Sequence, residues 1–347
     1  MQATSFQHSI LQWFDQHGRK DLPWQKNKNY YRVWVSEIML QQTQVSTVIP
    51  YFEKWMKRFP TIESLAAADS DEVMRYWSGL GYYARARNLH KAAKVVVEDY
   101  NAVFPTSHEE IQKLPGVGRS TGAAILALTD NQALAILDGN VKRVLSRFEA
   151  VEGWPGNPKV EAELWEVAER LMPEKRAADY TQAMMDLGAT LCTRTKPNCL
   201  LCPVQEHCKA RLSGNPEQYP HRKPKTEYPT KSACFLILCH DNSVLLEKRP
   251  SHGIWGGLWT LLSFESIAAL THWLTENGIN DKQEILPQCE HKFTHYRLLF
   301  TPIVVELSSY LAHLPNNWQW HSIGKLDTLG LPAPVRALLN QLYSFSL

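Results

Sequence analysis

Long hydrophobic runs and an export signal are absent from this sequence. No stretch of its 347 residues approaches the roughly 20 consecutive apolar residues of a membrane-spanning helix. Residues 1–24 also lack the basic head, the apolar middle and the small-residue cleavage site of a secretory leader. We therefore expect a cytoplasmic protein with no membrane partner.

Cysteine is scarce, and its placement is uneven. Three of the seven cysteines are scattered, whereas the other four fall within 17 residues in the pattern C-x6-C-x2-C-x5-C. In a chain without a leader, such spacing indicates a metal site rather than a disulfide framework. Tetrahedral zinc and a four-iron cluster both accept four thiolates, so spacing alone leaves the metal open. The candidate ligands are Cys192, Cys199, Cys202 and Cys208.

A large net charge is also missing, since the formal charge at pH 7 is only +2. Residues 1–225 hold 29 basic and 25 acidic side chains, whereas residues 226–347 hold 8 and 10. The segment 192–231, around the clustered cysteines, has eight Lys or Arg and three Glu. Such a local excess suits a phosphate backbone, although an ordinary solvated surface accounts for it almost as well.

The length and composition predict two domains. A chain of this length with 44% apolar content can bury two separate cores. Residues 213–230 contain four prolines and almost no aliphatic side chains, which is typical of an interdomain linker. Apolar residues recur at helical spacing before the linker, so residues 1–212 are predicted to be nearly all helix.

Residues 231–347 are predicted to form an α+β domain. Short runs rich in β-branched and aromatic residues alternate there with helical stretches near 266–278 and 333–343. The predicted strands are Ala233–Cys239, Ser243–Glu247, Trp259–Phe264 and Leu298–Leu307.

Two glycines interrupt the helical region in the segment Leu114-Pro115-Gly116-Val117-Gly118. Glycine permits a tight turn, and the backbone N–H groups at the start of the next helix can converge on an anion. A helix-hairpin-helix at about residues 112–123 would bind a DNA phosphate in this way, through Gly116 and Gly118. The same residues also fit an ordinary connection between helices.

Two carboxyl groups lie in contrasting sequence environments. Asp138 follows an apolar run and precedes a new helical pattern, so it is predicted to cap a helix whose dipole keeps it ionised. Glu37 interrupts an apolar helix, where desolvation would raise its pKa and hold a proton. Together they suit an acid and a nucleophile. A structural cap and a solvent-facing Glu are the simpler alternatives.

In combination, these motifs resemble the endonuclease III superfamily of DNA glycosylases: the helix-hairpin-helix, an Asp twenty residues beyond it, and the four-cysteine tail. Within that superfamily, residues 36–45 (SEIMLQQTQV) and 79–86 (GLGYYARA) resemble the adenine DNA glycosylases. The resemblance spans the chain. It implies a [4Fe-4S] cluster on the four cysteines and, as substrate, double-stranded DNA with adenine opposite 8-oxoguanine or guanine.

The resemblance also implies roles for single residues. Protonated Glu37 would donate to N7 of adenine, and Asp138 would stabilise the positive charge that develops on the sugar. Gln42 and Tyr82 match wedge residues that fill the space left by a flipped base. Ser120 stands where bifunctional relatives have a lysine, which implies base removal without an efficient lyase step.

Five basic residues are candidates for DNA contacts. Lys142 lies one helical turn beyond Asp138 and is expected near the same site, although a surface position is the simpler alternative. The DNA backbone could be held by Arg194 and Lys196, inside the cysteine loop, and by Lys209 and Arg211 after it.

The second domain resembles a Nudix fold. A working Nudix hydrolase needs a Glu-dense helix to hold Mg²⁺, but only Glu265 follows Gly256-Gly257-Leu258-Trp259 before the helix. Recognition is therefore expected rather than hydrolysis. Phe293-Thr294-His295 matches the loop that reads 8-oxoguanine, with Thr294 where the family commonly has Ser.

The sequence as a whole predicts a multidomain, monomeric enzyme. An all-α helix-hairpin-helix glycosylase domain with an iron-sulfur loop at 192–208 precedes an α+β Nudix-like lesion-recognition domain. The expected activity is base excision repair by hydrolytic, monofunctional removal of adenine from nucleoid DNA. The alternatives are a bifunctional endonuclease III-type lyase acting on damaged pyrimidines and a non-catalytic, metal-containing DNA-binding protein.

Overall fold

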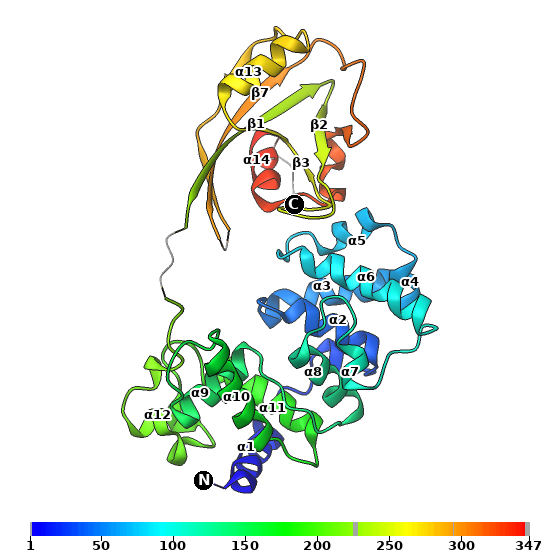
Figure 1. Ribbon diagram of the computed structural model, residues 1–347. Helices are drawn as coiled ribbons and strands as arrows, with labels where there is room; N and C mark the ends of the chain where they lie inside the picture. The colour runs from blue at the N-terminus through cyan, green and yellow to red at the C-terminus, as the bar shows by residue number, and fades with distance from the viewer. Residues whose placement is uncertain (1, 225–227, 294, 344–347) are drawn as a thin grey trace. The chain divides into compact units, whose positions relative to one another are not determined.

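The computed structural model describes residues 2–224, 228–293 and 295–343 (Figure 1). The chain divides into two compact units, one made of residues 1–67 and 88–225 and the other of residues 68–87 and 226–347. The division near residue 225 falls within the predicted linker, 213–230. The sequence pattern did not indicate that residues 68–87 would join the second unit. A membrane-spanning helix is not found among the described residues.

The described elements of the first unit are helical, and α6 begins in the segment that belongs to the second unit. The helices are α1 Ala3–His17, α2 Tyr30–Leu40, α3 Val45–Arg58, α4 Ile62–Ala66, α6 Ala84–Asp99, α7 His108–Ile111, α8 Arg119–Asp130, α9 Gly139–Glu149, α10 Pro158–Arg170, α11 Ala177–Thr190 and α12 Lys209–Leu212.

A single core joins the first helix of the chain to α8–α11. The helical spacing of Phe6, Ile10 and Phe14 places all three on the buried face of α1. The ring of Phe6 packs edge-on against Phe148 of α9, with 4.6 Å between the ring centres. Leu164 of α10 lies in the same buried cluster. The N-terminal helix therefore anchors the helices that carry the predicted Asp138 site.

The helix-hairpin-helix forms as predicted, from α7, the loop that follows it and α8. Gly116 has a φ of 81°, in the left-handed region, and a Cβ there would lie 2.8 Å from Asn88 Cβ. A side chain at this position would be strained by the backbone conformation and would crowd Asn88. Gly118 has ordinary backbone angles and occupies the N-cap position of α8.

The second unit is built on an eight-stranded mixed sheet. Its strand order is β3-β2-β1-β7-β5, with β4 paired to β1, β6 to β7 and β8 to β2. Only the pairing of β1 with β7 is parallel among the described ladders. The elements are α5 Ser70–Trp77, β1 Thr230–His240, β2 Ser243–Lys248, β3 Trp259–Thr260, β4 Leu262–Phe264, α13 Ile267–Glu276, β5 Gln283–Ile285, β6 Cys289–Lys292, β7 Arg297–Glu306, β8 Trp318–Ser322 and α14 Ala333–Tyr343.

Alternating residues of β1 face two separate buried clusters, as expected for a strand that is covered on both faces. Phe235 and Ile237 pack in one cluster with Leu339 of α14. Leu236 packs in the other cluster with Leu270 of α13. One helix therefore covers each face of the sheet, which confirms the predicted α+β character of this domain.

Candidate active site and cysteine pocket

A cavity of about 970 Å³ in the first unit brings the predicted catalytic residues together. Glu37 of α2 and Asp138, at the start of α9, both line it. Gln42, Ser120 and Arg194 line the same cavity, although they come from three separate segments. A volume of this size is large enough for a nucleotide withdrawn from a DNA helix.

Glu37 lies in a buried part of α2. Its neighbours Val35, Ser36 and Ile38 are buried, and its own side chain is partly exposed and lines the cavity. Burial raises the pKa of Glu37 to about 8, and the nearby charge of Asp138 adds to the effect. A carboxyl with this pKa carries a proton at neutral pH.

Asp138 caps α9, as the sequence predicts. Its Oδ1 accepts a hydrogen bond from Val141 N at 2.8 Å, and its Oδ2 accepts one from Asn140 Nδ2 at 3.3 Å. Burial nevertheless raises the pKa of Asp138, against the opposing effects of these donors and of Arg143. The expectation that the helix terminus alone sets its charge was therefore incomplete, because it left out burial in the cavity wall. The donors still favour the charged form of Asp138, so the proton between the two carboxyls belongs on Glu37.

Arg143, which the sequence analysis missed, connects Asp138 to the cysteine loop. It donates to Asn140 Oδ1 at 2.8 Å and to the carbonyl of Cys192 at 2.7 Å, while Asn140 donates to Asp138. Gly188 of α11 makes this close packing possible, because a Cβ there would lie 2.6 Å from Asn140 Cβ. The position of Asn140 is therefore fixed from both sides.

The four clustered cysteines line one small pocket beside α9. Arg147 of α9 is almost fully buried there, and its Nη1 lies 3.3 Å from Cys192 Sγ. Burial raises the pKa of Cys202 to about 12, and mutual repulsion between the thiolates contributes. Four such thiols become a thiolate set only around a cationic centre. Within the described residues, no group of three or more His, Cys, Asp or Glu side chains is arranged to hold a single metal ion.

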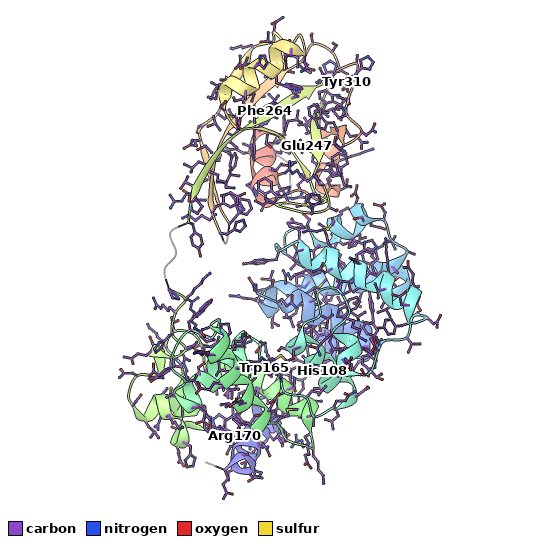
Figure 2. All side chains as sticks on the ribbon, viewed as in Figure 1. His108, Trp165, Arg170, Glu247, Phe264 and Tyr310 are labelled. Carbon is purple, nitrogen blue, oxygen red and sulfur yellow. The ribbon has the colours of Figure 1, made fainter. Side chains whose placement is uncertain are left out.

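Ser120 holds the segment that leads into Asp138. Its Oγ accepts a hydrogen bond from Leu137 N at 2.9 Å, so the hydroxyl fixes the residue immediately before the candidate nucleophile. Beside it at the hairpin, Arg119 stacks on Trp165, with 3.8 Å from the guanidinium carbon to the ring centre, and His108 Nε2 donates to Arg119 O. His108 and Trp165 are labelled in Figure 2.

Lys142 does not reach the position that the sequence predicts for it. Its Nζ lies 2.6 Å from Glu161 Oε1 on α10, and among the described residues Lys142 is not part of the cavity wall. One helical turn from Asp138 brings its side chain to the neighbouring helix instead of the carboxyl. The side chain of Lys142 is 25% exposed in this position.

A buried ion pair in the cavity wall was also missed. Arg19 donates through its backbone N and its guanidinium to Asp186, which is 1% exposed, and Gln182 Nε2 donates to Asp186 Oδ1 at 2.8 Å. Arg19 and Gln182 both line the cavity. The only local feature of the sequence that indicates this contact is the spacing of Gln182 and Asp186, which lie four residues apart on one helix. Arg19 lies 167 residues away from Asp186 in the sequence.

The remaining candidates for DNA contact lie on exposed segments. Gln42 and Tyr82 both adopt left-handed backbone angles, with φ of 58° and 49°, and Tyr82 is 49% exposed. Lys196 is exposed in the cysteine loop, and its backbone N donates to Glu217 Oε1.

An aromatic cluster surrounds the predicted reading loop of the second unit. The ring of Phe293 stacks on Tyr296 at 4.5 Å and contacts Trp255 at 5.5 Å and His291 at 4.6 Å. Phe293 N donates to Tyr296 O, which closes the turn, and His295 is exposed at its tip. Thr294 lies outside the described residues. In the same unit, α13 carries one acidic residue, Glu276, so the Glu-dense helix of a Nudix hydrolase is not present there.

Two protein-family models match the chain. Residues 35–170 match the HhH-GPD superfamily of base excision DNA repair proteins, and residues 233–341 match the NUDIX domain.

Known proteins similar to this chain include adenine DNA glycosylases from distant organisms. One from Buchnera aphidicola subsp. Acyrthosiphon pisum (strain APS) is 40% identical over 338 residues, which cover 96% of this chain and 97% of that protein. The Homo sapiens protein is 36% identical over 312 residues and covers 74% of this chain and 57% of its own length. Among solved structures, a thermostable thymine-DNA glycosylase is 28% identical, with a TM-score of 0.54 over 61% of this chain and 97% of that chain. A trapped endonuclease III–DNA covalent intermediate, at 19% identity, has the same fold, with a TM-score of 0.53 over 62% of this chain and 99% of that chain.

Proposed function

We propose that the protein removes adenine mispaired with 8-oxoguanine or guanine in double-stranded DNA. The chain belongs to the adenine DNA glycosylase family of base excision repair enzymes. The observation that carries the proposal is the pair of carboxyls in one cavity, in which Glu37 has a pKa of about 8 and Asp138 is held by hydrogen-bond donors. An acid and an anion are the two groups that hydrolysis of an N-glycosidic bond requires.

Glu37 acts as the general acid in this proposal. Adenine leaves poorly as an anion, and protonation at N7 neutralises it as the bond to the sugar breaks. Asp138 faces the positive charge that develops on the sugar and stabilises it, or bonds transiently to C1′. A water molecule then adds to C1′, where it displaces Asp138 if that bond has formed, and gives a proton to the Glu37 carboxylate. The product is an abasic site in an intact strand.

Gln42 and Tyr82 are proposed to occupy the space that the flipped adenine leaves in the duplex. Both are exposed, and both have left-handed backbone angles, which are uncommon for residues other than glycine. Local strain of this kind is typical of residues held in place for function. The DNA backbone nearby is proposed to be held by the hairpin glycines Gly116 and Gly118 and by the exposed side chains of Arg194 and Lys196.

Base removal is proposed to occur without a lyase step. A lyase of this class attacks the sugar with a lysine amine to form a Schiff base. The cations among the described residues of the cavity wall are arginines, namely Arg19, Arg143 and Arg194, and Ser120 stands at the position of the lysine in bifunctional relatives. Arginine stays protonated and cannot serve as that nucleophile.

The four cysteines are proposed to hold a [4Fe-4S] cluster. Four thiols that line one pocket suit either a zinc ion or a four-iron cluster. The resemblance to the endonuclease III superfamily favours the cluster. When bound, the cluster supplies the positive centre that keeps these thiolates charged and the DNA-binding loop ordered.

In the second unit, the loop at Phe293, Thr294 and His295 is proposed to read the base opposite adenine. The stacked aromatic rings around Phe293 hold this loop in place. The exposed imidazole of His295 offers a hydrogen-bond donor for the altered edge of 8-oxoguanine.

A product analysis tests the proposal against its alternatives. Purified protein is incubated with duplexes that contain A:8-oxoguanine, A:G, A:T or an oxidised pyrimidine, and strands are examined before and after alkali. We expect free adenine from the first two duplexes and strand breaks only after alkali. Direct strand cleavage at the oxidised pyrimidine would support the lyase alternative, and no excised base from any duplex would support the non-catalytic one.

A further inference from the structure

Three exposed basic side chains lie together at one end of the sheet in the second unit. Lys292, the last residue of β6, is paired with Arg297, the first residue of β7, across the turn at 293–296. Strand β1 runs parallel to β7 with Thr230 opposite Arg297, so Lys231 comes next on the same end. The side chains of Lys292 and Arg297 are 73% and 50% exposed, and Lys231 is exposed as well.

The basic residues of this domain, which has a net negative charge, are unevenly distributed. Residues 226–347 contain eight basic and ten acidic residues, and several of the basic side chains already have partners. Lys248 pairs with Asp71, Arg249 with Glu247, and Arg336 donates to Ser78. Three of the other five basic residues are the ones at the turn. The basic charge that this domain can offer to a ligand is therefore gathered at one end of its sheet.

The acidic groups at this end do not balance the three cations. Glu290 Oε1 lies 3.3 Å from Lys292 Nζ and 3.4 Å from Arg297 Nε, so one carboxylate is shared by two cations. Such long, exposed pairs contribute little and exchange readily for another anion. Lys231 lies over the ring of Tyr296, with 5.0 Å from Nζ to the ring centre, which holds the ammonium beside the turn.

We propose that Lys231, Lys292 and Arg297 bind phosphates of the DNA strand that carries 8-oxoguanine. The inference rests on the proposed function, because the turn between these residues holds Phe293 and His295, which are assigned to the oxidised base. A base that meets this turn brings the phosphates of its own nucleotide and of the next one alongside the turn. An arginine beside two lysines suits such a strand, since Arg binds phosphate through two N–H groups and Lys acts as a point charge.

Salt-dependent binding of the full-length protein provides the test. The variant Lys231→Gln/Lys292→Gln/Arg297→Gln is compared with wild type on a duplex that contains 8-oxoguanine opposite a non-hydrolysable adenine nucleotide. Each phosphate contact contributes about 0.9 to the slope of log K against log salt, so the slope should become shallower by about 2 to 3. Affinity at low salt should fall by about ten- to a hundredfold. The ratio of A:8-oxoguanine to A:G excision should be unchanged, because phosphate contacts carry no base information.

Lys282→Gln is the matched control. Lys282 is exposed in the same domain and precedes Gln283, which pairs with Val305, roughly 26 Å along β7 from Arg297. The slope of log K against log salt for Lys282→Gln should equal that of wild type. An unchanged slope in the triple variant would overturn the proposal even if wild type excises adenine normally. A fall in the excision ratio without a change in slope would overturn it too, since the residues would then position the reading loop. Failure of wild type to excise adenine would instead contradict the proposed function.

Discussion

At the scale of single residues, the proposed chemistry depends on one proton. Glu37 and Asp138 share a cavity, and burial raises the pKa of both. Of the two, only Asp138 caps the start of a helix and lies near the charge of Arg143. The asymmetry of donors assigns the proton to Glu37 and the charge to Asp138, which is the division of roles that acid-catalysed base removal needs.

Replacing Glu37 by Gln should therefore separate chemistry from binding. Glutamine keeps the size and hydrogen bonding of the acid but cannot supply a proton. We expect the single-turnover rate of adenine release to fall by about a hundredfold or more, while affinity for the mispair stays within a few-fold of wild type. Near-normal excision by the variant would assign the acid to another residue.

The stability of the same variant is an internal control. The pKa of Glu37 in the folded state, about 8, lies above its ordinary value of 4.5, so the unfolded chain releases the proton first. The free energy of unfolding that this group contributes therefore falls as pH rises from about 4.5 to about 8. Gln has no such proton, and Glu37→Gln should be as stable as wild type at pH 5 and more stable at pH 8. Thermal unfolding at the two pH values measures the difference.

At the scale of elements, α9 couples the two chemical sites of the first unit. Asp138 caps its N-terminus, Arg143 reaches the carbonyl of Cys192, and Arg147 reaches the sulfur of the same residue. The helix thus extends from the candidate catalytic carboxyl to the cysteine pocket. We therefore expect a substitution in the cysteine loop to change the proposed DNA contacts of that loop more than the environment of Glu37 on α2.

The variant Cys199→Ser should lose iron and DNA affinity together. Hydroxyl is a poor replacement for a thiolate ligand, and the loop that carries Arg194 and Lys196 would lose its support. Wild-type protein should be brown, with about four irons per chain, and the variant should bind mispaired duplex at least tenfold more weakly. Cys289→Ser, at a cysteine outside the pocket, is the control and should keep both properties. Stoichiometric zinc without iron, in protein made under iron-replete anaerobic conditions, would refute the cluster.

Sequence patterns predicted the elements well where local chemistry determines them. The cap at Asp138, the helix that carries Glu37 and the helices near 266–278 and 333–343 are all present. The short strands β5, β6 and β8 were missed because they are exposed or polar and depend on their partners in the sheet. The ion pair of Arg19 with Asp186 was missed because its partners meet only through folding.

At the scale of the whole molecule, the residues that are proposed to recognise a mispair come from both units. The first unit holds both carboxyls and the cavity, whereas the second holds the aromatic cluster and the basic residues at the turn 293–296. The segment 68–87, which includes Tyr82, belongs to the second unit although it lies within the helical sequence. The second unit is therefore built from two separate parts of the sequence.

A chain that ends at Arg222 should still excise adenine but should discriminate less well. Losing one or two hydrogen bonds to the oxidised base is worth about 1–3 kcal/mol, so the ratio of A:8-oxoguanine to A:G excision should fall roughly ten- to a hundredfold. His295→Ala in the full chain should show part of the same loss and guards against misfolding of the shortened protein. If the shortened protein is folded, keeps its cluster and preserves the full ratio, the second unit has another role.

The raised pKa of Glu37 is a property of the folded unit as a whole, because it arises from burial and from Asp138, which lies 101 positions further along the sequence. The most direct measurement of this central claim is the pH dependence of single-turnover adenine release from an A:8-oxoguanine duplex. The rate should be level near neutral pH and fall about tenfold per pH unit above about pH 8, as Glu37 loses its proton. Residual activity of Glu37→Gln should lack this fall. A wild-type rate that stays constant to pH 9.5, or an identical fall in the Gln variant, would contradict the account.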